Sequence, residues 1–363
     1  MPKALVIHPD FYAAPGGGER VSAAIISTLR EMGYEIYFYT KPPFNKVLLK
    51  ELLGLQLTDI THIAFPKWSF YNIVKYYDKV IKSIYLTTIV RNRLRADIKP
   101  DIEISTQDIE YLVGAGSSMI AYVNNILIPH KGAILPYRLY CKIGDMYFLR
   151  KKNLNKISIL CNSNFTKKKI KKLWKQEAIV LYPPVNTEIF SPLQKEDKQV
   201  ITVGRFDPWK NHGVVLKIAK QLPDFKFIIA GVIQDKNYYI KLLHNAGNLG
   251  NVSIYGNLPL NKLRFLLGQS KIYLHTAINE TFGITVVEAI ASGCIPVVHN
   301  SGGPAEIVGN LGYKYSDIPE CIRCLIKASK SSIDIEKLTN RAKQYDQRMF
   351  KRKMREIIKE ITV

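Results

Sequence analysis

One repeated unit constrains this chain more than any other feature of its sequence. The unit is a short apolar run, a turn marked by glycine or proline, and a longer segment with helical periodicity. Such alternation is typical of a parallel sheet flanked by helices. The unit recurs in two series, which are separated at Tyr182-Pro183-Pro184, where tandem prolines end regular structure. Because 363 residues also exceed what a single hydrophobic core usually supports, we expect two α/β domains, each Rossmann-like.

The prolines and the polar residues after them set the predicted domain boundaries. The segment Gln194–Lys198 is polar and charged and is not expected to be buried, so we expect a linker over residues 183–198. The first domain is expected over residues 1–182 and the second over residues 199–336. Residues 337–363 are basic with a helical pattern, and we expect them to pack back toward the first domain.

The individual elements are predicted from apolar runs and from a helical periodicity of about 3.6 residues. Strands are expected at Ala4–His8, Glu35–Tyr39, Ile102–Ser105, Met119–Val123, Ile157–Cys161, Val200–Val203, Lys226–Ala230, Val252–Tyr255, Ile272–His275 and Ile295–Val298. Helices are expected at Val21–Met32, Val214–Lys220, Asn237–Asn245, Asn261–Gly268 and Ile284–Ala291. The aromatic and basic region Lys67–Arg95 is interpreted as a packed helix pair.

The charge balance indicates a preference for anionic partners. The chain has 52 basic and 30 acidic residues, which gives a net charge of +22. Between Arg138 and Lys175 the only acid is Asp145, so this interval is expected to attract polyanions or anionic lipid headgroups. No apolar stretch approaches the ~20 residues of a membrane span, and the N-terminus does not read as a signal peptide. We therefore expect a cytoplasmic protein and leave peripheral attachment to the cytoplasmic membrane face open.

The five scattered cysteines are too few for a disulfide framework. Only Cys321 and Cys324 form a C-x-x-C pair, and a zinc site would need a second pair. Because the two residues lie at i and i+3 in an apolar helical pattern, we expect them to pack within a helix. The sequence predicts no metal site and no cofactor.

Functional residues are expected at the carboxyl ends of the predicted strands, where parallel α/β sheets bind ligands. Gly16, Gly17 and Gly18 come after the first strand and open the first helix. Glycines let a ligand approach the backbone, and the N–H groups of a helix start favour an anion. A flexible turn is the alternative, because the G-x-G-x-x-G spacing of dinucleotide binders is not met.

Two cations follow the first strand of the second domain. Arg205 and Lys210 lie in the segment Gly204-Arg205-Phe206-Asp207-Pro208-Trp209-Lys210. An arginine fork and a lysine point charge suit a diphosphate whose negative charge grows as it departs. A solvated charged loop is the alternative.

A third group of candidates surrounds the start of a helix in the second domain. Glu280 precedes the helix, Glu288 lies in its second turn, and its amino end is formed by Phe282, Gly283 and Ile284. Amides at a helix start hold phosphate or sugar oxygens, and carboxylates accept hydroxyls. Burying Glu288 in this apolar helix is unfavourable unless it is paired, so it is either a ligand contact or half of a structural ion pair.

Taken in order, these segments resemble the retaining glycosyltransferases of family 4, which have the two-domain GT-B fold. The resemblance runs through nearly the whole chain. Its most specific parts are the E-x7-E element from Glu280 to Glu288, the G-R-x4-K element of Gly204, Arg205 and Lys210, and the Gly-Gly-Pro-Ala-Glu loop that ends at Glu306. Segments that look like those of dolichol-pathway α-mannosyltransferases are Gly16–Arg20, Cys161–Thr166 and Tyr182–Asn186.

The resemblance implies an activity and roles for the candidate residues. The protein would move a hexose, mannose or glucose favoured, from a GDP- or UDP-sugar to a hydroxyl of a glycan or lipid-linked acceptor. It would retain the anomeric configuration and need no metal. The first domain would lie on the acceptor side, and the second would bind the nucleotide-sugar. Arg205 and Lys210 would neutralise the donor diphosphate, Glu280 and the helix-start amides would hold the donor sugar, and Glu288 would bind the ribose.

One departure from the family concerns a histidine. Relatives often carry Tyr-Val-His or Tyr-Cys-His after a first-domain strand, whereas this chain has Tyr122-Val123-Asn124 and a histidine only at His130. Asn124 can hydrogen-bond a sugar hydroxyl, or a shifted loop can bring His130 to the site. Both are candidate acceptor or sugar contacts, with a structural role as the alternative for His130.

Two other functions stay open at this stage. A sugar epimerase or phosphorylase would have the same fold, and product analysis with nucleotide-sugars would distinguish them. The net charge alone would also fit a nucleic-acid-binding protein. The basic residues show no recognised nucleic-acid motif, and carboxylates of the second domain would repel phosphates, so nucleic acid is not the expected partner.

Overall fold

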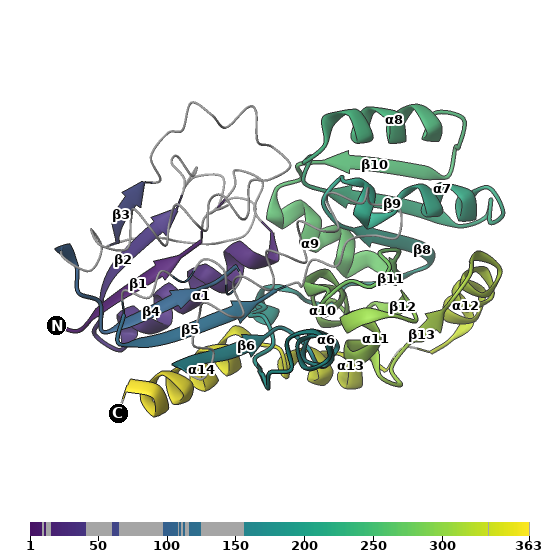
Figure 1. Cartoon of the computed structure of the whole chain (residues 1–363). Coiled ribbons are helices and arrows are strands. Elements are labelled where there is room, and N and C mark those ends of the chain that lie inside the picture. The colour runs from purple at the N-terminus through teal and green to yellow at the C-terminus, as the bar shows by residue number, and fades with distance from the viewer. Residues whose placement is uncertain are drawn as a thin grey trace.

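The computed structural model describes residues 1–8, 11, 16–40, 60–64, 97–107, 109, 112, 116–124, 156–332 and 334–362. Within these ranges the chain forms two parallel sheets with helices packed on them (Figure 1). The predicted α/β fold with two Rossmann-like units is confirmed. His130, the proposed helix pair at Lys67–Arg95 and residues 138–155 of the basic interval lie outside the described residues.

The first sheet has the strand order β3-β2-β1-β4-β5-β6-β7, and all its strands pair in parallel. Its strands are β1 (Lys3–Ile7), β2 (Glu35–Thr40), β3 (Thr61–Ala64), β4 (Ile102–Ser105), β5 (Ser118–Val123), β6 (Ile157–Cys161) and β7 (Ile179–Val180). Helix α1 (Gly17–Glu31) packs in one core cluster of this sheet and α6 (Asn164–Trp174) in another. The apolar run of β1 is fully buried from Ala4 to Ile7, as expected for a central parallel strand.

The second sheet has the order β10-β9-β8-β11-β12-β13 and is also parallel throughout. Its strands are β8 (Glu196–Val203), β9 (Lys226–Gly231), β10 (Val252–Gly256), β11 (Ser270–His275), β12 (Ile295–His299) and β13 (Tyr313–Tyr315). The helices around it are α7 (Gly213–Ala219), α8 (Lys236–Ala246), α9 (Leu260–Gln269), α10 (Ile284–Ala291), α11 (Gly302–Val308), α12 (Ile318–Lys330) and α13 (Ile335–Lys343). Two short 3₁₀ turns, η5 (Thr187–Ile189) and η6 (Pro208–Lys210), flank β8.

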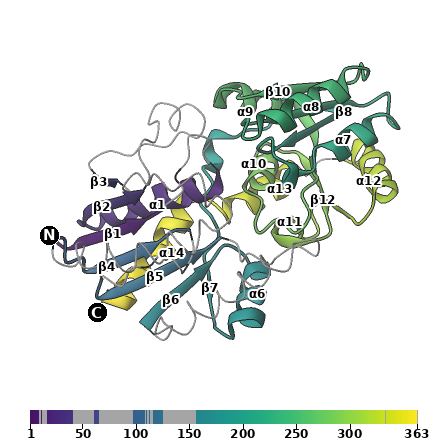
Figure 2. The same ribbon diagram turned by 45° about the horizontal axis from the view of Figure 1, so that its top comes forward.

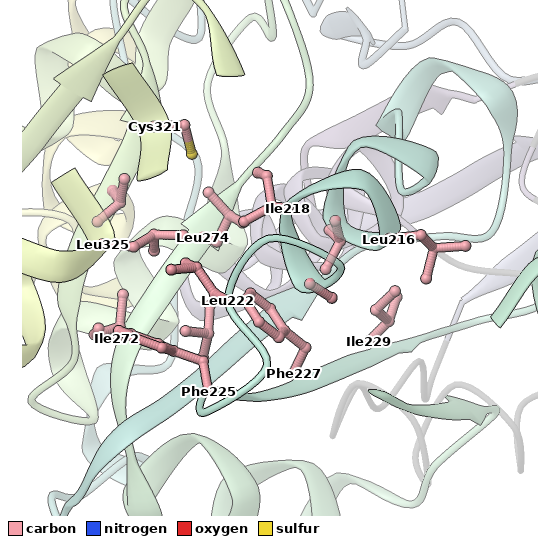
Figure 3. Close-up of a cluster of buried hydrophobic side chains, with 14 of the residues drawn as sticks. Leu216, Ile218, Leu222, Phe225, Phe227, Ile229, Ile272, Leu274, Cys321 and Leu325 are labelled. Carbon is pink, nitrogen blue, oxygen red and sulfur yellow. The ribbon is translucent and has the colours of Figure 1, made fainter. Parts of the chain in front are cut away.

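The second sheet is held to its helices by a dense apolar cluster (Figure 3). Ile218 of α7, Phe227 of β9 and Leu325 of α12 are all buried in it. Cys321 and Cys324 of the C-x-x-C pair lie in α12 and are buried in the same cluster. The prediction that this pair packs within a helix is confirmed.

The basic C-terminal segment forms two helices instead of one continuous helix. After α13 the chain turns at Tyr345 and Asp346 and continues as α14 (Gln347–Thr362), which lies beside α1 (Figures 1 and 2). Phe350, Met354 and Ile358 of α14 are buried in the core of the first sheet. The last helix of the chain therefore stabilises the first sheet.

The chain crosses between the two sheets twice, near Val185 and near Asp346, and the two crossing segments are hydrogen-bonded to each other. The Val185 N–H donates to the Tyr345 carbonyl at 3.1 Å, and the Gln347 N–H donates to the Val185 carbonyl at 2.9 Å. Asp346, which is 4% exposed, accepts a hydrogen bond from the Thr187 hydroxyl at 2.6 Å. These bonds fix both crossings next to one another.

Strand β8 begins at Glu196, four residues before the predicted start at Val200 and inside the segment expected as linker. Its charged residues lie at the start of the strand and are paired there. Lys226 Nζ donates to Glu196 Oε2 at 2.8 Å, and Lys271 Nζ donates to Asp197 Oδ1 at 2.7 Å. Glu196 and Asp197 thus find cationic partners at the start of the strand, and neither carboxylate residue is buried.

Candidate active site

A pocket of about 380 Å³ lies between the two sheets. Among the residues that line it are these sequence candidates: Gly16, Gly17, Gly18, Asn124, Arg205, Lys210, Glu280, Phe282, Gly283, Ile284 and Glu288. The structure therefore brings together every candidate except His130, which lies outside the described residues. Residues from strand ends of both sheets share one cavity, as the fold requires.

Lys210 and Glu280 meet on the second-sheet side of the pocket. Lys210 Nζ donates a hydrogen bond to Glu280 Oε2, and His275 Nε2 lies 3.8 Å from the same oxygen. Burial raises the pKa of Glu280, but the charge and hydrogen bond of Lys210, together with His275 and Arg205, outweigh burial, so the net pKa is lowered. Glu280 is therefore a carboxylate at neutral pH, held next to a cation.

Lys210 is positioned by the turn η6 that follows β8. Asp207 Oδ1 accepts the Trp209 N–H at 2.8 Å, and Pro208 starts the turn with its fixed φ. The Thr276 hydroxyl, just after β11, donates to the Lys210 carbonyl at 2.7 Å. Two neighbouring strand ends thus orient this lysine.

Two buried histidines near Lys210 were missed by the sequence reasoning. Burial lowers the pKa of His275, at the end of β11, to about 4. Burial, reinforced by the Lys210 charge, lowers the pKa of His212 to about 3. Both imidazoles are neutral at pH 7, so they add no positive charge to the pocket.

The glycine segment of the first half approaches the second half closely. A Cβ atom added at Gly16 would lie 3.3 Å from Arg205 Nη1, and one added at Gly17 would lie 3.0 Å from Ile284 Cδ1. Both separations are tighter than ordinary van der Waals contact. Glycine at these positions therefore lets the start of α1 approach the arginine and α10 across the pocket.

One amide of the glycine segment is already occupied in this state. The Gly16 N–H donates to Glu19 Oε2 at 2.7 Å, and Glu19 is buried in the first turn of α1. This carboxylate satisfies a donor that a bound anion would otherwise use. The proposed contact of Gly16 with the donor can therefore arise in two ways. The donor packs against the Gly16 backbone without accepting its N–H, or Glu19 moves and frees that N–H.

The start of α10 is shaped by a glycine and supported from α11. Gly283 has a φ of +96°, in the left-handed region that favours glycine. The Gly303 N–H donates to the Glu280 carbonyl at 2.8 Å, and the Asn279 N–H donates to Ser301 Oγ at 2.9 Å. The Gly-Gly-Pro-Ala-Glu segment, expected as a loop, forms the start of α11, and this helix start holds the backbone that carries Glu280.

Glu288 has an ion-pair partner from the other half of the chain. Its Oε1 lies 2.6 Å from Arg20 Nη1, and the two side chains are 1% and 14% exposed. Glu288 Oε1 makes no hydrogen bond with the described residues beyond this ion pair. The structure thus shows an ion pair at this residue, and the ribose contact stays a prediction.

Three residues that the sequence reasoning did not assign to the site connect the two halves beside the pocket. Asn162 Nδ2 donates to the Asn124 carbonyl at 2.8 Å and to Thr281 Oγ1 at 3.1 Å. The Ser163 hydroxyl donates to the Thr281 carbonyl at 2.6 Å. We call Asn162, Ser163 and Thr281 the interdomain clamp. Asn162 and Thr281 also line the pocket, next to Glu280 and Phe282.

His8 is a further pocket residue that the sequence reasoning did not select. It follows β1, and its Nδ1 lies 2.7 Å from Ser22 Oγ and 2.8 Å from Thr106 Oγ1. Asn124 Nδ2 donates to the Thr106 carbonyl at 2.7 Å. The position of His8 directly after a buried strand was the signal available in the sequence.

Comparisons with known proteins relate this fold to glycosyltransferases. Residues 186–349 match the family model described as Glycosyl transferases group 1. A glycosyltransferase from Rickettsia africae shares the fold, with a TM-score of 0.72 and 19% identity over 99% of this chain and 98% of that chain. Anabaena HepE in complex with UDP and glucose has a TM-score of 0.71 and 16% identity over 99% and 100% of the two chains. The predicted GT-B fold is confirmed.

Among curated relatives, the human GDP-Man:Man(3)GlcNAc(2)-PP-Dol alpha-1,2-mannosyltransferase is 30% identical over 203 residues, 47% of this chain and 41% of that protein. The match thus spans less than half of the length of this relative. Residues 186–349 thus resemble group 1 glycosyltransferases, and the predicted resemblance to dolichol-pathway mannosyltransferases is confirmed.

Proposed function

We propose that this protein is a retaining glycosyltransferase that moves a hexose from a nucleotide-diphosphate sugar to a hydroxyl of a glycan or lipid-linked acceptor. One observation carries the proposal. Arg205, Lys210, Glu280 and the amino end of α10 line a single pocket between two Rossmann-like sheets. Mannose and a GDP-sugar are favoured because the relative named above is a GDP-Man-dependent mannosyltransferase.

The chemistry of the pocket suits a departing diphosphate. When the bond between the anomeric carbon and the phosphate oxygen breaks, negative charge builds up on the diphosphate. Arg205 and Lys210 provide two cations for that charge, and a preorganised donor stabilises it more than water does. A diphosphate at Lys210 would compete with Glu280 for the ammonium group and free the carboxylate to accept a sugar hydroxyl.

Metal-independent transfer with retention is part of the same proposal. The two side-chain cations would stabilise the leaving group in place of a metal ion. Within the described residues no group of three or more histidine, cysteine or acidic side chains could hold a metal. Transfer that persists in excess chelator, with product of the donor's anomeric configuration, supports the proposal. Two results would overturn it. One is a loss of turnover on chelation that Mg²⁺ or Mn²⁺ restores, and the other is a product with inverted anomeric configuration.

Thermal unfolding in the presence of GDP, UDP or ADP tests the donor assignment. A ligand at one hundred times its dissociation constant adds about 2.7 kcal/mol of stability, so the preferred nucleotide should raise Tm clearly above the others. Incubation with the matching nucleotide-sugars then separates transfer from epimerisation or phosphorolysis by product analysis. If no nucleotide stabilised the protein, the assignment would be wrong.

We also propose that the protein attaches peripherally to the cytoplasmic face of an anionic membrane. Lys168, Lys171 and Lys172 of α6 are exposed, and Leu173 beside them is 44% exposed. Among the described residues no helix is long and apolar enough to cross a membrane. Sedimentation with phosphatidylglycerol vesicles should show binding at low salt that weakens at high salt. Absence of binding at low salt would contradict this proposal.

A further inference from the structure

The turn that positions Lys210 also presents an exposed tryptophan. Trp209 is 76% exposed, more than any other large apolar side chain of the described chain apart from Met1 at 87%. An indole with this exposure leaves a large apolar face in water, and such side chains are enriched where proteins bind partners. The exposure therefore points to a ligand.

The turn holds the backbone of Trp209 in a fixed place. The Trp209 N–H is bonded to Asp207, and the Asn211 N–H donates to the Pro208 carbonyl at 3.1 Å. The base of the turn is tied to the chain after β9, because the Asp235 N–H donates to the Phe206 carbonyl at 2.9 Å. A backbone fixed before binding loses little conformational entropy when a ligand packs on the side chain that it carries.

Trp209 lines a second, open cavity of about 570 Å³. Its other lining residues are Arg205, Asp207, Pro208, Gln234, Asp235, Lys236 and Asn237. One aromatic face is thus surrounded by amide, carboxylate and cationic side chains. A pyranose ring matches this combination, because its C–H face packs on an indole while its hydroxyls exchange hydrogen bonds with the polar groups around it.

The charges of this cavity favour a neutral ligand. The two cations, Arg205 and Lys236, are matched by two acids, Asp207 and Asp235. An anionic lipid surface or a nucleic acid would instead select an excess of cations.

Arg205 lines both this cavity and the pocket between the sheets. A saccharide chain with one end in the pocket can therefore extend along this arginine to Trp209. We propose that the cavity at Trp209 is a saccharide subsite that holds non-reacting sugar units of the acceptor. The identity of this saccharide as the acceptor rests on the proposed function, whereas binding of a saccharide at Trp209 does not.

Calorimetry with the full chain tests the subsite, with α-1,2-linked mannotriose and free mannose as probes. The wild-type protein is expected to bind the trisaccharide more tightly than mannose. Trp209→Ala should weaken trisaccharide binding about tenfold or more, since truncation of an aromatic anchor commonly has an effect of this size. Trp209→Tyr keeps an aromatic face and should recover part of the affinity. Phe265→Ala removes another exposed aromatic side chain, 54% exposed on α9, and should leave trisaccharide binding unchanged.

Three outcomes would overturn the subsite: no trisaccharide binding by the wild type, equal binding by Trp209→Ala, or Trp209-dependent binding to phosphatidylglycerol vesicles instead of the saccharide. GDP and UDP are titrated into the same samples. Unchanged nucleotide affinity of Trp209→Ala shows that the variant is folded. A wild type that binds the trisaccharide but no nucleotide would refute the proposed function and leave the subsite standing.

Discussion

The two halves of the chain contribute different chemistry to the pocket. The second half supplies charged groups that follow strands of its own sheet, with Arg205 and Lys210 after β8 and Glu280 after β11. The first half contributes closely approaching backbone at Gly16 and Gly17, and side chains such as Arg20 and Asn162 that bond to the second half.

This difference assigns separate tasks to the two halves. If the proposed function is right, recognition of the donor's anionic group depends mainly on the second half, because charge-assisted contacts are the strong ones. The first half closes the pocket and sets its geometry. Substitutions in the second half should therefore change nucleotide affinity, and substitutions at the contacts between the halves should change stability or turnover.

The largest effect is expected from removal of both cations. Arg205→Ala combined with Lys210→Ala should lower kcat/KM on the order of 10³-fold or more, because loss of one preorganised donor at a developing charge already costs about 10²–10³. Nucleotide affinity should fall as well. The matched control is Lys262→Ala with Arg323→Ala, which removes two exposed cations outside the pocket. If the first double variant kept normal turnover and affinity in a folded sample, anion recognition would not reside in the second half.

The second effect concerns the ion pair across the pocket. Arg20→Ala should lower the free energy of unfolding by about 3–5 kcal/mol, because it leaves the buried Glu288 carboxylate unpaired. Urea denaturation measures this change. Adding Glu288→Gln to Arg20→Ala should recover part of the loss, since the neutral amide is less costly to bury. A loss below about 1 kcal/mol would show that contacts other than Arg20 stabilise Glu288.

The third effect is a pH dependence that arises in the second half. His275 and His212 have folded pKa values of about 4 and about 3, below the ordinary 6.5, so the unfolded chain binds more protons as the pH falls. Stability should therefore be lost as the pH falls below 6.5, by about 1.4 kcal/mol per pH unit for each histidine, until the folded pKa is reached. His275→Gln should reduce this slope between pH 6 and pH 5 in urea titrations. An unchanged slope would show that His275 does not stay neutral in the folded protein.

The sequence predicted the parts of the fold that depend on local pattern. Central strands such as β4 and β6 and helix α10 lie where their apolar runs placed them. The edge strands β7 and β13 were missed because each has only two or three residues, and Ile179 of β7 is 49% exposed. Such short runs carry no distinct alternation.

The site was predictable to the extent that its residues follow strands. Arg205, Lys210 and Glu280 share a pocket because strand ends of a parallel sheet meet at one edge. The bonds of Asn162 and Ser163 to Thr281 could not be predicted, because they depend on how the two sheets face each other. No local periodicity encodes that placement.

The smallest effect should come from the interdomain clamp. Thr281→Val preserves the side-chain shape and the backbone carbonyl that Ser163 contacts, but removes the Oγ1 acceptor of Asn162 Nδ2. One hydrogen bond contributes about 1 kcal/mol, so kcat should fall about fivefold if the clamp positions the loop that carries Glu280. The nucleotide dissociation constant should change little, because the cations stay in place. Thr339→Val is the matched control, since the Thr339 hydroxyl bonds only within its own helix α13. Weaker nucleotide binding with normal kcat would instead show that Thr281 contacts the donor. That result would contradict the division of roles between the two halves.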